Sequence, residues 1–173
     1  MATVTVNATP QVQVTQYGAG ILSGVAVNKT ETFRSLFTSS GVAADQCDTL
    51  HIRTYAFAAS TPQTIDLLSL LDIFGAPAVF ARVRLLAIKL VGAADGQALL
   101  LGGAGANEWD GFLSPGAKVS VFPGTAAAGN DGYLILAAPG ATGVPVLAGS
   151  HLLKLDPGAG AFSAEVVVAG ASA

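Results

Sequence analysis

The sequence predicts an all-β protein: a single antiparallel β-sandwich or jelly-roll-like domain with an extended N-terminal arm and one short helix. Roughly eight or nine short apolar runs are bounded by Gly, Pro, Asn and Asp, as in sandwiches and barrels. Strands do not alternate with long helical patterns, which would indicate a parallel sheet. At 173 residues the chain can bury its own core. We expect the arm over residues 1–44 and the domain over 45–173.

The first strands are expected in the arm. Residues 3–6 and 11–15 alternate strictly between apolar and polar side chains, and Pro10 separates them. Residues 17–41 lack a sustained period, which predicts an extended segment with short pairings near 21–27 and 32–37. An alternating segment can add a strand to the sheet edge of a neighbouring molecule. The alternatives are that it supplies strands to its own domain or is disordered.

The middle of the chain predicts strands and the one short helix. Residues 50–58 form a strand pattern, and residues 63–71 begin as a strand before 69–74 take a helical spacing that Gly75 ends. Residues 78–92 fit both periods, but the alternation in their second half favours a strand. The Ala-Asp-Gly sequence at 94–96 predicts a hairpin turn into a strand over 97–101.

The C-terminal half repeats short strands and turns. The separators contain Gly with Pro, Asn or Asp, residues that turn geometry favours. Expected strands cover 118–122, 133–138, 144–149, 151–156 and 161–170.

The composition indicates a soluble or assembled protein with an uncharged surface. Only 11% of residues are charged, against about 25% in a typical domain, and mean hydropathy is +0.59. The longest hydrophobic stretch, residues 76–92, contains three basic residues, which argues against a membrane span. No signal peptide is readable at the start, so synthesis in the cytoplasm is expected. The uncharged surface indicates either burial against other subunits, which we favour, or simply many small residues.

Charge and cysteine content exclude several classes of partner and site. Eight basic and eleven acidic residues give a net charge of −3, too little positive charge for a nucleic-acid partner. Cys47 is the only cysteine, which excludes an internal disulfide and a thiolate zinc cluster. We expect it to be an inert, half-buried thiol. No membrane partner is expected.

A glycine-rich stretch at residues 97–111 raises the question of dinucleotide binding. Glu108 stands where such a loop needs its third glycine, and its carboxylate would repel a pyrophosphate. The Ser-Pro-Gly sequence at 114–116 prevents the long helix that must follow the loop. The stretch therefore predicts a tight bend in a β protein, and no cofactor is expected.

The remaining polar residues do not indicate a catalytic site. His51 and His151 are expected to face solvent or an interface, and no third donor indicates a metal site. No serine-hydrolase elbow, zinc-protease helix or phosphate loop is present. The aspartates are interpreted as caps and turn residues: Asp45, Asp48, Asp66, Asp72, Asp95, Asp131 and Asp156. We therefore predict no enzyme and no catalytic, cofactor-binding or metal-ligating residues.

One alternative uses the aromatic residues. Trp109, Phe112 and Tyr133 would suit a sugar-stacking surface, although they would equally suit packing at the end of the domain or against another subunit.

From about residue 45 to 172 the chain resembles small structural proteins encoded in the head-gene regions of tailed bacteriophages and prophages. The likeness lies in the order of short motifs: Asp45-Gln46, Ala58-Ala59-Ser60, Ile65-Asp66-Leu67, Phe74-Gly75, Phe80–Val83, Leu101–Ala104, Val121–Gly124, Leu136–Pro139, Ala141–Gly143, Leu152-Leu153 and Val168–Ser172. The family often has a glycine at position 125 and an aspartate at 140, where this chain has Thr125 and Gly140.

The resemblance implies a virion component, a capsid decoration or cement protein on the head surface. Its partners would be the major capsid protein and further copies of itself, with a trimer expected by analogy. Three alternatives stay open. They are a head-fibre base, tail or receptor-binding module that holds host glycans, a jelly-roll shell protein, which the lack of basic charge disfavours, and a cellular enzyme.

Overall fold

The computed structural model describes residues 11–17, 26–32, 42–44, 46–72, 74–103, 105–123, 132–138 and 140–172. In this part of the chain the protein is all-β without a helix, and every pairing between its strands is antiparallel. This confirms the expected all-β, antiparallel class. Within the same residues, no helix has the length and apolar character that a membrane crossing requires.

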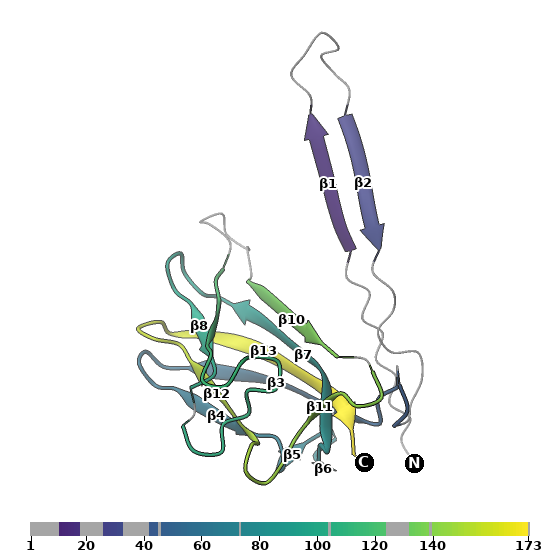
Figure 1. Ribbon diagram of the computed structural model, residues 1–173. Coiled ribbons are helices and arrows are strands. Elements are labelled where there is room, and N and C mark those ends of the chain that lie inside the picture. The colour runs from purple at the N-terminus through teal and green to yellow at the C-terminus, as the bar shows by residue number, and fades with distance from the viewer. Residues whose placement is uncertain are drawn as a thin grey trace.

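Two main sheets make up the body of the molecule (Figure 1). The five-stranded sheet has the order β10 (Tyr133–Ala137), β7 (Arg82–Val91), β13 (Phe162–Ala171) and β3 (Thr49–Phe57), and β11 (Val144–Pro145) also pairs with β7. The four-stranded sheet has the order β4 (Gln63–Asp66), β12 (Leu152–Asp156), β8 (Leu99–Leu101) and β9 (Val119–Val121).

Two small hairpins complete the fold. β5 (Leu70–Leu71) pairs with β6 (Pro77–Ala78) beside the start of β3. β1 (Gln11–Tyr17) pairs with β2 (Ala26–Thr32) over seven residue pairs, and this hairpin stands clear of the two sheets in Figure 1. Residues 3–6 and 33–37, where further arm strands and pairings were expected, lie outside the described residues, as do residues 21–25 of the range 21–27.

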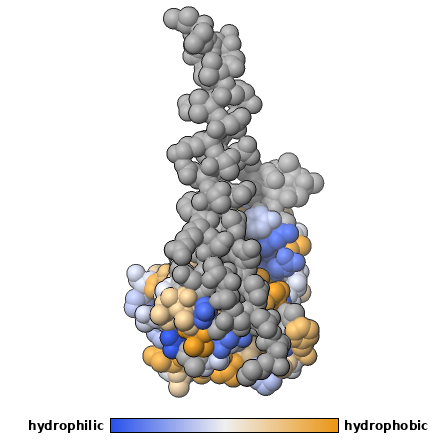
Figure 2. Space-filling view, turned by 90° about the vertical axis from the view of Figure 1, so that its right-hand side faces the viewer, coloured by the Kyte–Doolittle hydropathy of each residue, from blue (hydrophilic) through white to orange (hydrophobic). Residues whose placement is uncertain are grey.

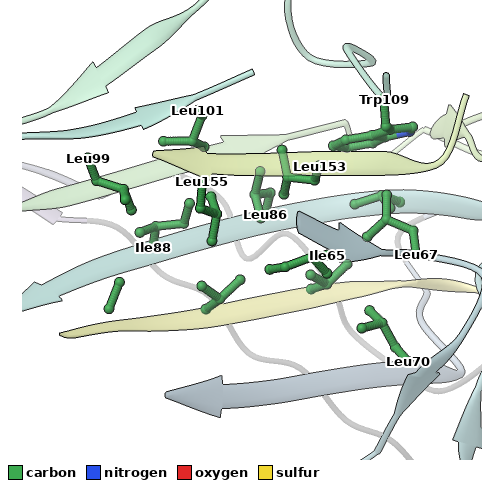
Figure 3. Close-up of a cluster of buried hydrophobic side chains, with 14 of the residues drawn as sticks. Ile65, Leu67, Leu70, Leu86, Ile88, Leu99, Leu101, Trp109, Leu153 and Leu155 are labelled. Atoms are coloured by element: carbon green, nitrogen blue, oxygen red, sulfur yellow. The ribbon is translucent and has the colours of Figure 1, made fainter. Parts of the chain in front are cut away.

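Both sheets contribute side chains to one hydrophobic cluster (Figure 3). Alternate residues of a strand point to opposite faces, so each strand of the two sheets turns one set inward. The buried members include Leu86, Ile88, Leu90, Val166 and Val168 from the five-stranded sheet and Ile65, Leu99, Leu101, Leu153 and Leu155 from the four-stranded sheet.

The helical turn expected around residues 69–74 is absent from the described residues there. Asp72 instead closes the β5–β6 hairpin, because its carboxylate accepts hydrogen bonds from the Phe74 and Ala76 amides at 2.8 and 2.9 Å. The Asp72 amide also donates to the Ala76 carbonyl at 2.8 Å. The apolar spacing that suggested a helix therefore belongs to a chain that folds back on itself.

The expected hairpin at residues 94–96 is also corrected. The turn is present, since the Gln97 amide donates to the Ala94 carbonyl and Gly96 has a φ of +78°. The strands on its two sides are not paired, because β7 lies in the five-stranded sheet and β8 in the four-stranded sheet. The turn is a corner between the sheets.

Candidate interaction surface

The outer face of the five-stranded sheet carries an apolar row across four strands. Register places Ile135 of β10, Ala87 of β7, Val167 of β13 and Ile52 of β3 side by side. The neighbours of Ile135, Ala87 and Val167 along their strands pack in the core cluster, and the neighbour His51 of Ile52 is buried, so these four point outward. Ile52 is 46% exposed and Ile135 is 49% exposed. We call these four residues the outer apolar row.

The rows on either side of the outer apolar row differ. One consists of Tyr133, Lys89, Glu165 and Thr54, and the Lys89 ammonium lies 5.9 Å from the centre of the exposed Tyr133 ring. The other consists of Ala137, Leu85, Ala169 and Leu50. Cys47 packs on Leu85 and Ala169 in a second small cluster, so part of this row is covered by the chain itself.

The outer face of the four-stranded sheet is polar by comparison. Cross-strand neighbours there include Thr64 with Lys154, Asp66 with Leu152, and Asp156 with Leu100. Lys154 and Asp156 form an ion pair at 3.3 Å, and the Gly158 amide donates to Asp156 at 2.9 Å. These hydrogen bonds and Lys154 lower the pKa of Asp156, the amide being the largest cause. A polar outer face is what an antiparallel sheet in water normally has.

His51 is a correction to the sequence interpretation, because it is buried rather than solvent-facing. Its Nδ1 donates to the Leu71 carbonyl at 2.6 Å, since a carbonyl can only accept, and its Nε2 lies 3.0 Å from the Tyr55 hydroxyl. Burial raises the pKa of Tyr55, against the opposing effect of Arg53, whose guanidinium lies 5.5 Å from the Tyr55 ring centre. With His51 turned inward, alternation turns Ile52 outward.

Two shallow pockets lie on the body of the molecule. One, of about 400 Å³, lies between β3 and the β5–β6 hairpin and is lined by Ile52, Leu71 and Asp72 among others. Phe74 at the end of this hairpin is 79% exposed. The other, of about 550 Å³, lies between the turns at 95–98 and 156–160. Exposed hydrophobic residues are interspersed with hydrophilic ones on the side that Figure 2 shows.

A buried arginine anchors the segment that leads into the body. Arg84 of β7 is fully buried, and its guanidinium donates to the carbonyls of Val42, Ala43, Gln46 and Ala141. In the pairing of β7 with β13, Val83 lies opposite Gly170 and Leu85 lies opposite Ala169. Arg84 has no opposite residue, so it is the extra residue of a β-bulge. Its Nε has no hydrogen-bond partner among the described residues.

Cys47 lies beside this anchor and is completely buried. Burial raises the pKa of its thiol to about 12, with Arg84 acting in the opposite direction and Asp48 in the same one. Asp48 itself accepts hydrogen bonds from the Ser172 amide and hydroxyl at 2.9 and 2.6 Å, which ties the last described residues to β3. Asp45 lies outside the described residues.

The glycine stretch forms a tight bend. Gly102 and Gly103 have φ values of +98° and +75°, and the Gly103 amide donates to the Glu108 carboxylate. Glu108 thus binds its own loop, and the next elements are turns rather than a helix.

The aromatic residues do not form one surface. Trp109 is only 3% exposed, donates from Nε1 to the Pro145 carbonyl at 3.0 Å and packs edge-on against Phe112, while Tyr133 lies exposed on β10. Trp109 is therefore too buried to stack on a glycan, which weakens the hypothesis of a sugar-stacking surface.

The other polar candidates have local roles. Asp66 accepts from the Leu68 amide at 3.0 Å, and His151 Nε2 lies 3.9 Å from the same carboxylate. The Nδ1 atom of the half-buried His151 has no hydrogen-bond partner in the described part of the chain. Asp95 lies in an exposed turn, and Asp131 lies outside the described residues. Over the described ranges, His, Cys, Asp and Glu side chains form no group of three that could hold a metal ion.

No protein-family model, curated protein or solved structure matches this chain. Function has to be inferred from the surface, the composition and the resemblance described above.

Proposed function

We propose that this chain is a non-enzymatic virion structural protein, a capsid decoration or cement protein. It would bind the outer surface of a tailed-phage head and stabilise the head by bridging capsid subunits. The proposal is supported by the outer face of the five-stranded sheet, on which the outer apolar row runs across four strands beside the row that contains Lys89 and Glu165. The solvated face of an antiparallel sheet normally carries polar residues, so an uninterrupted apolar row across four strands favours contact with another protein surface.

The composition supports the same function. With 11% charged residues the chain has little charge for its surface, as expected of a protein whose surface is partly covered by neighbouring subunits. A cement protein needs a rigid body and apolar contact surfaces, and it needs no catalytic cleft. The resemblance to phage head-region proteins supplies the specific setting, the capsid surface of a virion assembled from proteins made in the host cytoplasm.

We further propose that the two main sheets form a sandwich of the jelly-roll kind. The main hydrophobic cluster, to which both sheets contribute, supports this arrangement. The partners in this proposal are the major capsid protein and further copies of the chain, with a trimer expected by analogy and no nucleic acid or membrane involved. No cofactor takes part.

Quantitative mass spectrometry of purified particles tests the function. We expect a copy ratio of this chain to the most abundant shell protein near one, or a simple fraction fixed by lattice symmetry. A few copies per particle would support the alternative of a head-fibre base, tail or receptor-binding module, and absence from the particles would contradict a virion role.

A further inference from the structure

We infer that the outer face of the five-stranded sheet is the binding site for a second copy of this chain. The contact is centred on the outer apolar row, in which Ile52 and Ile135 are each almost half exposed. Four apolar side chains side by side on the outer face of a sheet leave apolar area in water that a second sheet packed on this face would cover. The outer face of the four-stranded sheet exposes less apolar area across its strands, because Lys154, Asp66 and Asp156 lie on it.

The pattern of residues on this face is self-complementary. A two-fold axis parallel to the strands, between β7 and β13, would place β7 of one copy over β13 of the other. Ala87 would then face Val167, and Ile135 would face Ile52, so apolar residues meet apolar residues. A contact of this kind is isologous, because the same patch is used by both copies.

The charges on the face match under the same axis. Lys89 and Glu165 are cross-strand neighbours in the row next to the outer apolar row. The axis brings Lys89 of each copy opposite Glu165 of the other, so two charge pairs form across the contact. Opposed charges of this kind select the correct partner and register. An unrelated protein would need its own apolar row and oppositely placed charges, whereas a second copy already has both.

The expected contact is modest in size. Four strands about 4.8 Å apart and the open rows of this face cover roughly 300 Å² on each copy, which is less than a standard specific interface buries, so the contact alone is expected to be weak. Association through this contact is therefore expected to be reversible and to depend on protein concentration. A trimer about a different axis is compatible with this contact, because a lattice requires more than one kind of contact. The inference rests on the proposed function only in that a structural subunit must join its neighbours.

The first experiment measures the mass of the purified full-length chain in solution by light scattering over a concentration series. We expect the mass to double as concentration rises. The double variant Ile52→Asp with Ile135→Asp should associate at least about tenfold more weakly, because buried carboxylates lack partners in the contact. Thr64→Asp, on the polar face, is the matched control and should associate like the wild type. Circular dichroism confirms that each variant is folded.

The second experiment exchanges the charges and does not depend on apolar burial. The Lys89→Glu chain carries two acids in the pair, and the Glu165→Lys chain carries two bases. Each alone should associate more weakly than the wild type, and an equimolar mixture should recover association as a heterodimer. The recovery can arise only between molecules, because the repulsion within each chain persists in the mixture. Lys154→Glu on the other sheet is the control: it should pair with itself like the wild type, and mixing it with Glu165→Lys should not bring the Glu165→Lys chain into a heterodimer.

Three results would overturn the inference: no doubling for the wild type, unchanged doubling in the Ile52 and Ile135 variant, or no recovery in the mixture. Particle composition remains a separate readout. A chain that pairs as described but is absent from particles would contradict the proposed function and leave the self-contact in place.

Discussion

At the scale of single residues, Arg84 does most to place the segment before β3. Burying a cation is costly, and here carbonyl oxygens rather than a carboxylate compensate it. The arrangement joins residues 42–46 and the loop at Ala141 to the bulge in β7. We interpret Arg84 as a residue that fixes one conformation of the segment before β3, at the cost of burying its charge.

Replacing Arg84 tests this anchor. We expect Arg84→Met to lower the free energy of unfolding by about 2–4 kcal/mol, because the four carbonyls that the buried guanidinium holds together lose their donor. Arg82→Met is the control, since Arg82 is only half-buried and donates to the single carbonyl of Ala141, and its cost should stay below about 1 kcal/mol. Urea unfolding gives both values, and equal losses would contradict the anchoring role.

Cys47 gives stability a specific pH dependence. Its pKa is raised from 9.0 to about 12 in the folded protein, so below pH 9 both states hold the proton. Between pH 9 and 12 the unfolded chain releases the proton while the folded one keeps it, so stability falls by up to about 1.4 kcal/mol per pH unit. Unfolding curves of the wild type and Cys47→Ala should diverge over this range. Parallel curves would show that the thiol is not desolvated.

The histidine shows what sequence could not predict at this scale. The alternation through β3 was evident, but its direction was not, because Leu50 and Ile52 are more apolar than His51 and Thr49. His51 is inward because the Leu71 carbonyl and the Tyr55 hydroxyl partner both its ring nitrogens. The Leu71 carbonyl comes from a distant hairpin, and the reversal it permits creates the outer apolar row.

At the scale of elements, the β5–β6 hairpin depends on one carboxylate. Asp72→Ala removes the acceptor of the Phe74 and Ala76 amides, and we expect a loss of about 1–2 kcal/mol. Asp72→Asn keeps a side-chain acceptor and should lose less. Amide hydrogen exchange should become faster at residues 70–78 in the alanine variant. Unchanged exchange there would show that the strands alone hold the hairpin.

The glycine bend after β8 offers a matched pair of substitutions. Gly102 has a φ of +98°, and a Cβ there would lie 2.6 Å from the Ala117 carbonyl oxygen. Gly105 has a φ of +85°, but a Cβ would meet nothing within 4 Å. Gly105→Ala should therefore cost about 1 kcal/mol from backbone strain, and Gly102→Ala clearly more. Thermal unfolding compares them, and equal costs would mean that the loop can shift.

At the scale of the whole molecule, local pattern located most strands of the body but not their sheets. Residues 50–58, 151–156 and 161–170 were expected as strands and are β3, β12 and β13 within a residue or so. Sheet membership depends on pairings between distant segments, which apolar alternation does not encode. The corner at 94–96 shows this, because its turn residues suit a hairpin and a change of sheet equally well.

The N-terminal arm can be tested by removing it. Among the described residues, β1 and β2 pair with each other and not with a strand of the two main sheets. A chain that starts at residue 42 keeps both sheets and the carbonyls that Arg84 binds, so we expect it to unfold cooperatively with a midpoint close to that of the full chain. If the arm adds a strand to a neighbouring subunit, this shortened chain should fold and yet bind purified heads much more weakly. If it unfolds instead, residues 1–41 belong to the domain's own structure, and the arm hypothesis is wrong.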